Sequence, residues 1–161
     1  MTPQQAFDTY HRAVHAFAYR LTRSADIADD ITQECFLAFV RAPGRLDASR
    51  GTPKTYLFAI ARNLALKHYR DERPEDPLED SPSETFSPVL ALAVEQAVSS
   101  LPVLQRESIV LFEYEGLTLE EIAQVTGADV GTVKSRLHRA RERLKRILAP
   151  HRKATNADRT V

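Results

Sequence analysis

Cysteine is almost absent from this chain of 161 residues, since Cys35 is the only one. A single thiol excludes an internal disulfide and a zinc site built from several cysteines. Glycine is scarce, and the prolines cluster outside the segments with helical periodicity, which favours an all-helical protein. No apolar run approaches the length of a membrane span, and no stretch has the pattern of a signal peptide. We therefore expect a cytoplasmic protein that inserts no segment into a membrane.

Positive and negative charges balance over the whole chain, with 22 residues of each sign, but they are unevenly distributed. Residues 1–70 hold ten basic and six acidic side chains, residues 71–90 hold one and seven, and residues 91–161 hold eleven and nine. The acidic segment also has four prolines and little periodicity, which predicts a linker. We predict two small helical domains, 1–70 and 91–150, joined by this linker and followed by a frayed tail at 151–161.

The clearest motif lies in residues 116–148, which predict two helices joined by a tight turn. Thr118 and Glu121 have the spacing of a capping box. Gly127 is placed to end the first helix in the left-handed conformation, and Asp129 is placed to cap the second. A shorter helix at 91–100 and another at 103–115 are expected to support this helix-turn-helix unit.

The second helix of that unit is apolar on one side and basic on the other. Between residues 134 and 146 there are seven basic side chains and one acidic side chain. Such a helix suits the major groove of DNA, and the alternative is a solvated basic face on a core helix. The candidate contacts to duplex DNA are Thr132, Lys134, Ser135, Arg136, His138, Arg139, Arg141 and Arg146.

Residues 6–22 and 24–42 predict the first two helices. Cys35 lies on the core stripe of the second helix, so we interpret it as a small buried hydrophobe. The far side of that helix has an apolar strip with carboxylates around it, which favours a protein partner with basic residues around a groove. The alternative is that another helix of the same bundle covers the strip. The candidate partner-binding residues are Asp29, Asp30, Gln33, Glu34, Phe36, Leu37 and Val40.

A third helix is predicted from Pro53 to about residue 70, after a loop at 43–51. Basic and aromatic residues alternate around it, and single-stranded nucleic acid is bound by cations that neutralise phosphate and rings that stack on bases. The alternative is that the rings belong to the core. The candidate contacts to single-stranded DNA are Arg45, Arg50, Lys54, Tyr56, Phe58, Arg62, Asn63, Lys67 and Tyr69.

Enzymatic function finds little support in the sequence. No metal-ligand set, phosphate-cradling glycine loop or nucleophile–base pair is evident. His11 and His15 lie four residues apart, but no third ligand is near, so ordinary surface histidines are the better interpretation. We therefore expect no catalytic residue, no metal and no cofactor.

Three stretches in this order resemble the extracytoplasmic-function (ECF) sigma factors of bacterial RNA polymerase. Residues 29–36 (DDITQECF) resemble the polymerase-binding helix of sigma region 2, and residues 56–63 (YLFAIARN) resemble its promoter-melting helix. Leu101-Pro102, residues 116–123 (GLTLEEIA) and residues 131–136 (GTVKSR) resemble region 4.

The resemblance implies an alternative sigma factor without catalytic activity of its own. Region 2 would bind the β′ clamp helices of core polymerase and hold the −10 element as a single strand. Region 4 would read the −35 duplex and meet the β flap, and an anti-sigma factor would be a further partner. Tyr56 stands where the family usually has Trp, and Lys67 stands where Asp is frequent. The alternative function is a stand-alone helix-turn-helix transcriptional regulator.

Overall fold

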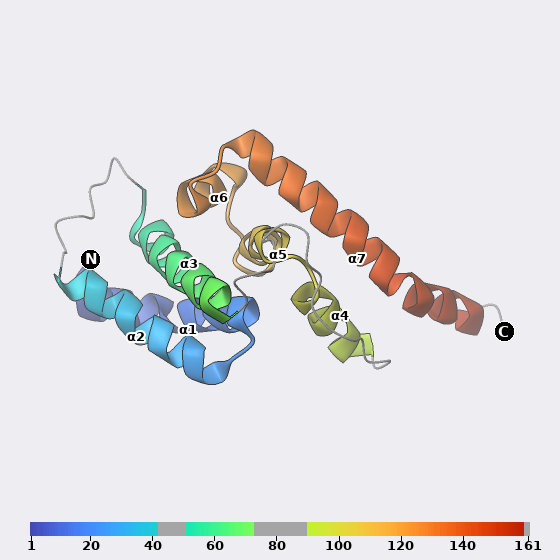
Figure 1. The fold of residues 1–161 in the computed structure, drawn as a ribbon, viewed down its shortest axis with the longest axis horizontal. Helices are drawn as coiled ribbons and strands as arrows, with labels where there is room; N and C mark the ends of the chain where they lie inside the picture. Colours follow the sequence, from blue (N-terminus) through green and yellow to red (C-terminus); the bar gives the residue numbers. More distant parts are fainter. Residues whose placement is uncertain (42–50, 73–89, 160–161) are drawn as a thin grey trace.

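The computed structural model describes residues 1–41, 51–72 and 90–159, and all regular elements in those ranges are helical (Figure 1). The predicted all-α fold is confirmed. Arg45, Arg50 and most of the predicted linker fall outside the described residues. In chain order the elements are α1 (Pro3–Thr22), α2 (Ala25–Arg41), α3 (Pro53–Glu72), α4 (Leu90–Ser99), α5 (Val103–Ile109), the π-helical turn η3 (Val110–Tyr114), α6 (Leu119–Thr126) and α7 (Val130–Arg159).

The helix-turn-helix unit begins and ends where the sequence places its caps. The Thr118 hydroxyl accepts the N–H of Glu121, and the Glu121 carboxylate accepts the N–H of Thr118. Gly127 ends α6 in the left-handed conformation, with φ of 73°. Asp129 accepts the backbone N–H of Thr132 at 2.7 Å. Hydrogen bonds from Thr132 hold the pKa of the Asp129 carboxyl below its ordinary value, as expected of a helix N-cap.

The first half of the chain is a bundle of α1, α2 and α3. Phe17 on α1 and Phe58 on α3 are fully buried, and their rings meet edge to face with centroids 5.3 Å apart. Cys35 on α2 is also fully buried, and its Sγ lies 3.2 Å from the carbonyl oxygen of Leu57. Burial raises the pKa of the Cys35 thiol to about 12. The interpretation of Cys35 as a small buried hydrophobe is therefore confirmed.

The second half differs from expectation at two places. The predicted single helix at 103–115 is divided into α5 and η3, where the N–H of Glu115 bonds to the carbonyl of Val110 at 3.1 Å. The helix that was expected to end near residue 148 continues to Arg159 with Pro150 inside it, so the tail is helical as far as Arg159. Pro150 removes an N–H donor from the ladder and its ring crowds the carbonyl four residues earlier, so the helix continues past a residue that disfavours it.

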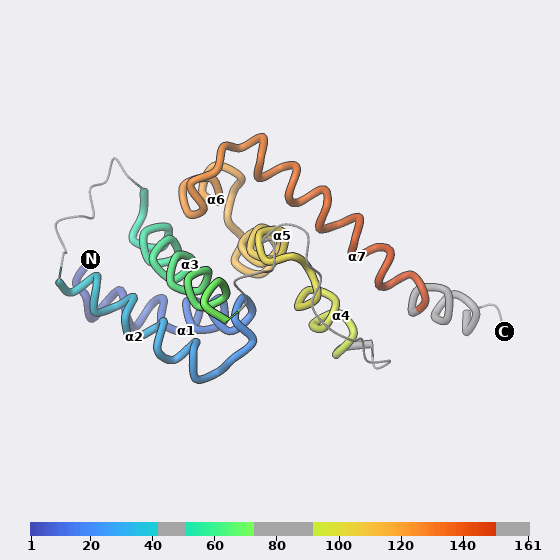
Figure 2. Tube along the Cα trace, viewed as in Figure 1, coloured from blue at the N-terminus to red at the C-terminus, as the bar shows by residue number. Residues whose placement is uncertain are grey.

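The two halves pack against each other through α3. On one side α3 contacts α1 and α2, and on the other it lies along α6 (Figures 1 and 2). One apolar cluster runs through both halves, from Ala6 on α1 to Ala140 on α7. A second cluster joins α3 to α5 and consists of Leu66, Tyr69, Val103 and Leu104. The two predicted domains thus share a core.

Within the described ranges, no helix is both long and apolar enough to cross a membrane.

Candidate nucleic-acid and polymerase interfaces

The outer face of α2 carries most of the predicted partner-binding strip. Leu37 and Val40 are 48% and 55% exposed. Asp29, Asp30, Gln33 and Glu34 are exposed beside them. Phe36 differs from the prediction, because its side chain is buried and its ring lies edge-on to Phe7 of α1, with centroids 5.1 Å apart. Phe36 is therefore covered by another helix of the bundle, whereas the other residues of the strip are exposed.

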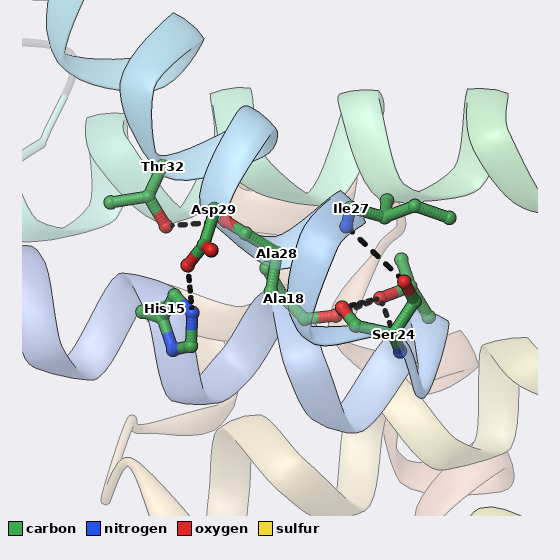
Figure 3. Close-up of polar contacts among 8 residues, drawn as sticks. His15, Ala18, Ser24, Ile27, Ala28, Asp29 and Thr32 are labelled. Atoms are coloured by element: carbon green, nitrogen blue, oxygen red, sulfur yellow. Dashed lines mark hydrogen bonds and ion pairs between the residues drawn. The ribbon is translucent and has the colours of Figure 1, made fainter.

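One acid of this strip is held by the neighbouring helix. The Nε2 atom of His15 on α1 lies 2.8 Å from Oδ1 of Asp29 (Figure 3). Both side chains are well exposed, so this contact contributes little to folding, but it orients the Asp29 carboxylate. The beginning of α2 is fixed nearby, where the N–H of Ile27 donates to the Ser24 hydroxyl (Figure 3).

The aromatic residues predicted to stack on bases occupy three different environments on α3. Phe58 is fully buried against Phe17, so its ring is a core residue and the prediction of a base contact was wrong. Tyr56 is half-buried, with its ring edge-on to that of Phe39 at 6.3 Å. Tyr69 is buried in the cluster that joins α3 to α5. The polar residues Asn63 and Lys67 are exposed.

Arg62 on α3 forms a forked ion pair with Glu107 on α5. The guanidinium Nε and Nη2 donate to Oε2 and Oε1 of the carboxylate at 2.8 and 3.0 Å. The Glu107 side chain is 0% exposed and that of Arg62 is 15% exposed. Burial raises the pKa of the Glu107 carboxyl, while the hydrogen bonds and charge of Arg62, and then the charge of Arg136, lower it. The buried Glu107 carboxylate thus faces one arginine predicted to bind DNA from each half, Arg62 and Arg136.

Two more basic residues of the first half meet the second half. Lys54 Nζ donates to the carbonyl oxygen of Glu115 at 3.2 Å. The guanidinium of Arg20 lies 4.1 Å from the centroid of the Tyr114 ring. Burial raises the pKa of the Glu115 carboxyl, whereas the charges of Lys54 and Arg20 lower it. The contact between the halves therefore joins a basic surface to an acidic one.

The face of α7 predicted to read duplex DNA is open along most of its length. Lys134, Ser135, His138, Arg139 and Arg146 are exposed, and Thr132 is half-buried beside the cap. Arg141 is exposed as well, with a 3.6 Å ion pair to Glu113 and a cation–π contact to the Phe112 ring. Arg136 is half-buried and faces the second half's own interior near Glu107.

Comparisons with known proteins match both halves of the chain. Residues 6–75 match the family model Sigma-70 region 2, and residues 91–144 match Sigma-70, region 4. The chain is 36% identical over 151 residues to the ECF RNA polymerase sigma factor SigM of Mycobacterium tuberculosis, covering 89% of this chain and 76% of that protein.

The chain belongs to the ECF sigma factors.

A second relative supports the assignment. The chain is 31% identical over 163 residues to the ECF sigma factor SigW of Bacillus subtilis, covering 88% of this chain and 86% of that protein. As an ECF sigma factor the chain is an alternative sigma factor that directs transcription initiation.

Two solved structures resemble this ECF sigma factor. One is the sigma factor RpoE in complex with the anti-sigma factor NepR from Bartonella quintana, with a TM-score of 0.72, 27% identity, and 91% and 96% of the two chains covered. The other is CnrH in complex with the cytosolic domain of CnrY, with the same TM-score and identity, and 92% and 88% covered.

The buried polar residues of α5 were missed by the sequence reasoning. Gln105, Arg106, Glu107 and Ser108 are all less than 5% exposed. The Arg106 guanidinium donates to the carbonyl oxygens of Leu21 and Leu101 at 2.7 and 3.0 Å. The only signal in the sequence is a run of four polar residues within a helix that is otherwise apolar, and a run of that kind is more often a solvated face.

Proposed function

We propose that this ECF sigma factor binds core polymerase through α2, reads the −35 duplex through α7, and holds the −10 strand through α3. The observation that carries the proposal is the open, basic face of α7, which follows the capped turn of a helix-turn-helix unit. Phosphate contacts by the cations would supply affinity, and Ser135, His138 and Arg139 would supply sequence choice. We place this activity in the cytoplasm, and no bond-making step is assigned to the chain.

Core polymerase would meet the exposed part of the α2 strip. Leu37 and Val40 offer an apolar centre, and the surrounding carboxylates favour a partner surface with basic residues at its edge, as expected for the β′ clamp helices. Phe36 supports this surface from beneath through its contact with Phe7 and is not itself offered to the partner.

On α3, Tyr56, Asn63 and Lys67 are the residues best placed for the −10 strand. Asn63 and Lys67 are exposed, and Tyr56 keeps part of its ring accessible. Lys54, Arg62 and Tyr69 contact the second half, so they would join the DNA surface only after the halves separate. Arg45 and Arg50 stay predictions from the sequence.

The second half also has an apolar groove between α4 and α7. Val94, Val98, Ile109 and Leu144 line it, together with Tyr114 and the ion pair of Glu113 with Arg141. We assign this groove to an anti-sigma protein that presents a helix with apolar residues, because one of the two similar structures is a complex with an anti-sigma factor. Calorimetric titration with such helices should show binding that is lost in Leu144→Asp, and unchanged binding would contradict the assignment. The β flap stays a prediction.

Run-off transcription with purified core polymerase and a library of promoter fragments tests the function. We expect specific initiation that depends on the chain. Leu37→Asp should abolish it by placing a charge at the centre of the polymerase contact, whereas Tyr19→Asp, an equally exposed site on α1, should not. Arg139→Ala should weaken binding of the selected duplex by about 1–3 kcal/mol in fluorescence anisotropy. Duplex binding without any binding to core polymerase would instead indicate a stand-alone regulator.

A further inference from the structure

Where the halves meet, basic side chains of the first half lie against a ring, a carbonyl and a carboxylate of the second half. Residues 107–129 contain six acids and no base, so this part of the second half is acidic. The three basic residues that meet it are also the kind of residue that binds DNA phosphate. They are Arg20 against the Tyr114 ring, Lys54 against the Glu115 carbonyl, and Arg62 against the Glu107 carboxylate.

We propose that Glu107 is a latch: it holds the two halves together by occupying Arg62 as a DNA phosphate would, and so withholds α3 from single-stranded DNA until the halves separate. This inference rests on the proposed function of α3. It goes beyond that function because it names the contact that keeps the surface closed in the chain alone, without a partner protein.

Geometry makes Glu107 a good substitute for phosphate. A guanidinium binds carboxylate and phosphate with the same forked pair of N–H donors, and both N–H···O distances to Glu107 are short. Arg62 therefore cannot serve both partners at once. Glu107 lies on a helix whose seven residues are all buried, so its position is fixed, and α3 must move away from α5 before Arg62 is released.

Loss of the latch should shift a two-state equilibrium between closed and open forms. Removing one partner of a buried, hydrogen-bonded charge pair is among the costly changes at an interface, so the ratio of open to closed molecules should rise by at least about tenfold. The apparent affinity for a ligand of the open form is reduced by the fraction of molecules that are open. Affinity for single-stranded DNA should therefore rise with that fraction.

Spin labels can report the separation of the halves in the full chain. Asp26 on α2 and Glu120 on α6 are exposed and lie on different halves, so Asp26→Cys with Glu120→Cys provides the label sites. The native Cys35 is fully buried and its thiol has a pKa of about 12, so it does not compete for the label. Interspin distances are then measured in the parent, in Glu107→Gln and in Arg62→Gln.

Glu113→Gln is the control for the loss of one paired carboxylate at an exposed site. It is the same substitution on the same half, and the ion pair of Glu113 is made with Arg141 inside that half. We expect both latch variants to gain a population at longer distance and the control to keep the parent distribution. Because Glu107 also faces Arg136, Glu107→Gln carries a risk of local unfolding, and Arg62→Gln gives the same answer from the partly exposed side.

Binding of a mixed-sequence single-stranded DNA of about 20 nucleotides provides the second readout. Glu107→Gln should bind it at least about tenfold more tightly than a parent that is mostly closed, because the open fraction rises while Arg62 remains. Arg62→Gln should open as far but gain less, since the cation itself is gone. Parent-like distances in both variants would overturn the latch, and an open Glu107→Gln that binds no more tightly would overturn the competition with DNA.

Failure of the latch and failure of the proposed function are distinguishable. The distance measurement needs neither polymerase nor promoter. Run-off transcription by the parent chain tests the function whether or not Glu107 holds the halves together.

Discussion

Arg106 connects three segments although its side chain is almost wholly buried. It is 1% exposed, and its guanidinium donates to carbonyl oxygens at the end of α1 and before α5. Arg106→Met would keep much of the volume but leave both acceptors buried without a donor. We expect the free energy of unfolding to fall by about 2–4 kcal/mol, measured by urea titration followed by circular dichroism. Arg12→Met, at an exposed site on α1, should change it by less than about 0.5 kcal/mol.

The Cys35 thiol predicts a specific dependence on alkaline pH. Its pKa is raised by burial from 9.0 to about 12 in the folded chain, so the unfolded chain releases this proton first as pH rises. The stabilising effect of the neutral thiol is complete below pH 9 and is lost as pH rises through 12, with a slope approaching about 1.4 kcal/mol per pH unit. Unfolding free energies of the parent and Cys35→Ala, compared between pH 8 and about 11, should diverge in this direction. Parallel pH profiles would contradict the prediction.

Single residues show where sequence reasoning stops. Thr118, Gly127 and Asp129 were predictable because a cap or a left-handed turn depends on a few neighbouring positions. Glu107 and Arg62 lie 45 positions apart. Nothing local indicates that their charges would be buried together, since charged residues on a helix are usually solvated.

At the scale of an element, two residues of α2 that looked equivalent in the sequence lie in different environments. Phe36 is buried against Phe7 and Leu37 is 48% exposed, although both lie on the predicted strip. Phe36→Ala should lower the free energy of unfolding by about 2–4 kcal/mol, because it opens a space beside the Phe7 ring. Leu37→Ala should leave stability nearly unchanged and weaken binding to core polymerase instead. Urea titration and a polymerase pull-down with purified components separate the two effects.

Helical periodicity predicted where the elements begin and which faces are apolar, but not which apolar faces meet. From the sequence, the apolar strip of α2 and the rings of α3 could each contact either a binding partner or a neighbouring helix. Phe58 became a core residue because Phe17 of α1 lies opposite it, and that pairing depends on how the helices cross. The length of α7 was misjudged because the polar composition of the tail was taken as a sign of fraying.

At the scale of the whole molecule, a shared core predicts cooperative unfolding. One apolar cluster continues from α1 to α7, and a second one joins α3 to α5. We expect a single transition in scanning calorimetry of the full chain, with equal calorimetric and van't Hoff enthalpies. A chain with weakened contact between the halves, such as Glu107→Gln, should show a broader transition or two. Two well-separated transitions in the parent would contradict cooperative packing of the halves.

The division of the chain into two helical halves was predictable from composition, because the acidic, proline-rich segment interrupts the helical periodicity. The packing of the halves was not. It depends on apolar faces that meet in one core and on complementary charge between segments that are far apart, with the basic side on α3 and the acidic side between α5 and α6. The charge counts showed that acidic and basic residues lie in different segments, and in the folded chain some of these segments meet each other.

The cover that α5 provides for α3 has a consequence during synthesis. On the ribosome, Leu66 and Tyr69 are made, and leave the exit tunnel, before Val103 and Leu104 do. At about 5–20 residues per second, the nascent chain spends a few seconds with that side of α3 uncovered. Within that interval Leu66 and Tyr69 lack their apolar partners on α5, and Arg62 lacks the Glu107 carboxylate. The order of translation therefore exposes the surface that the finished molecule keeps covered.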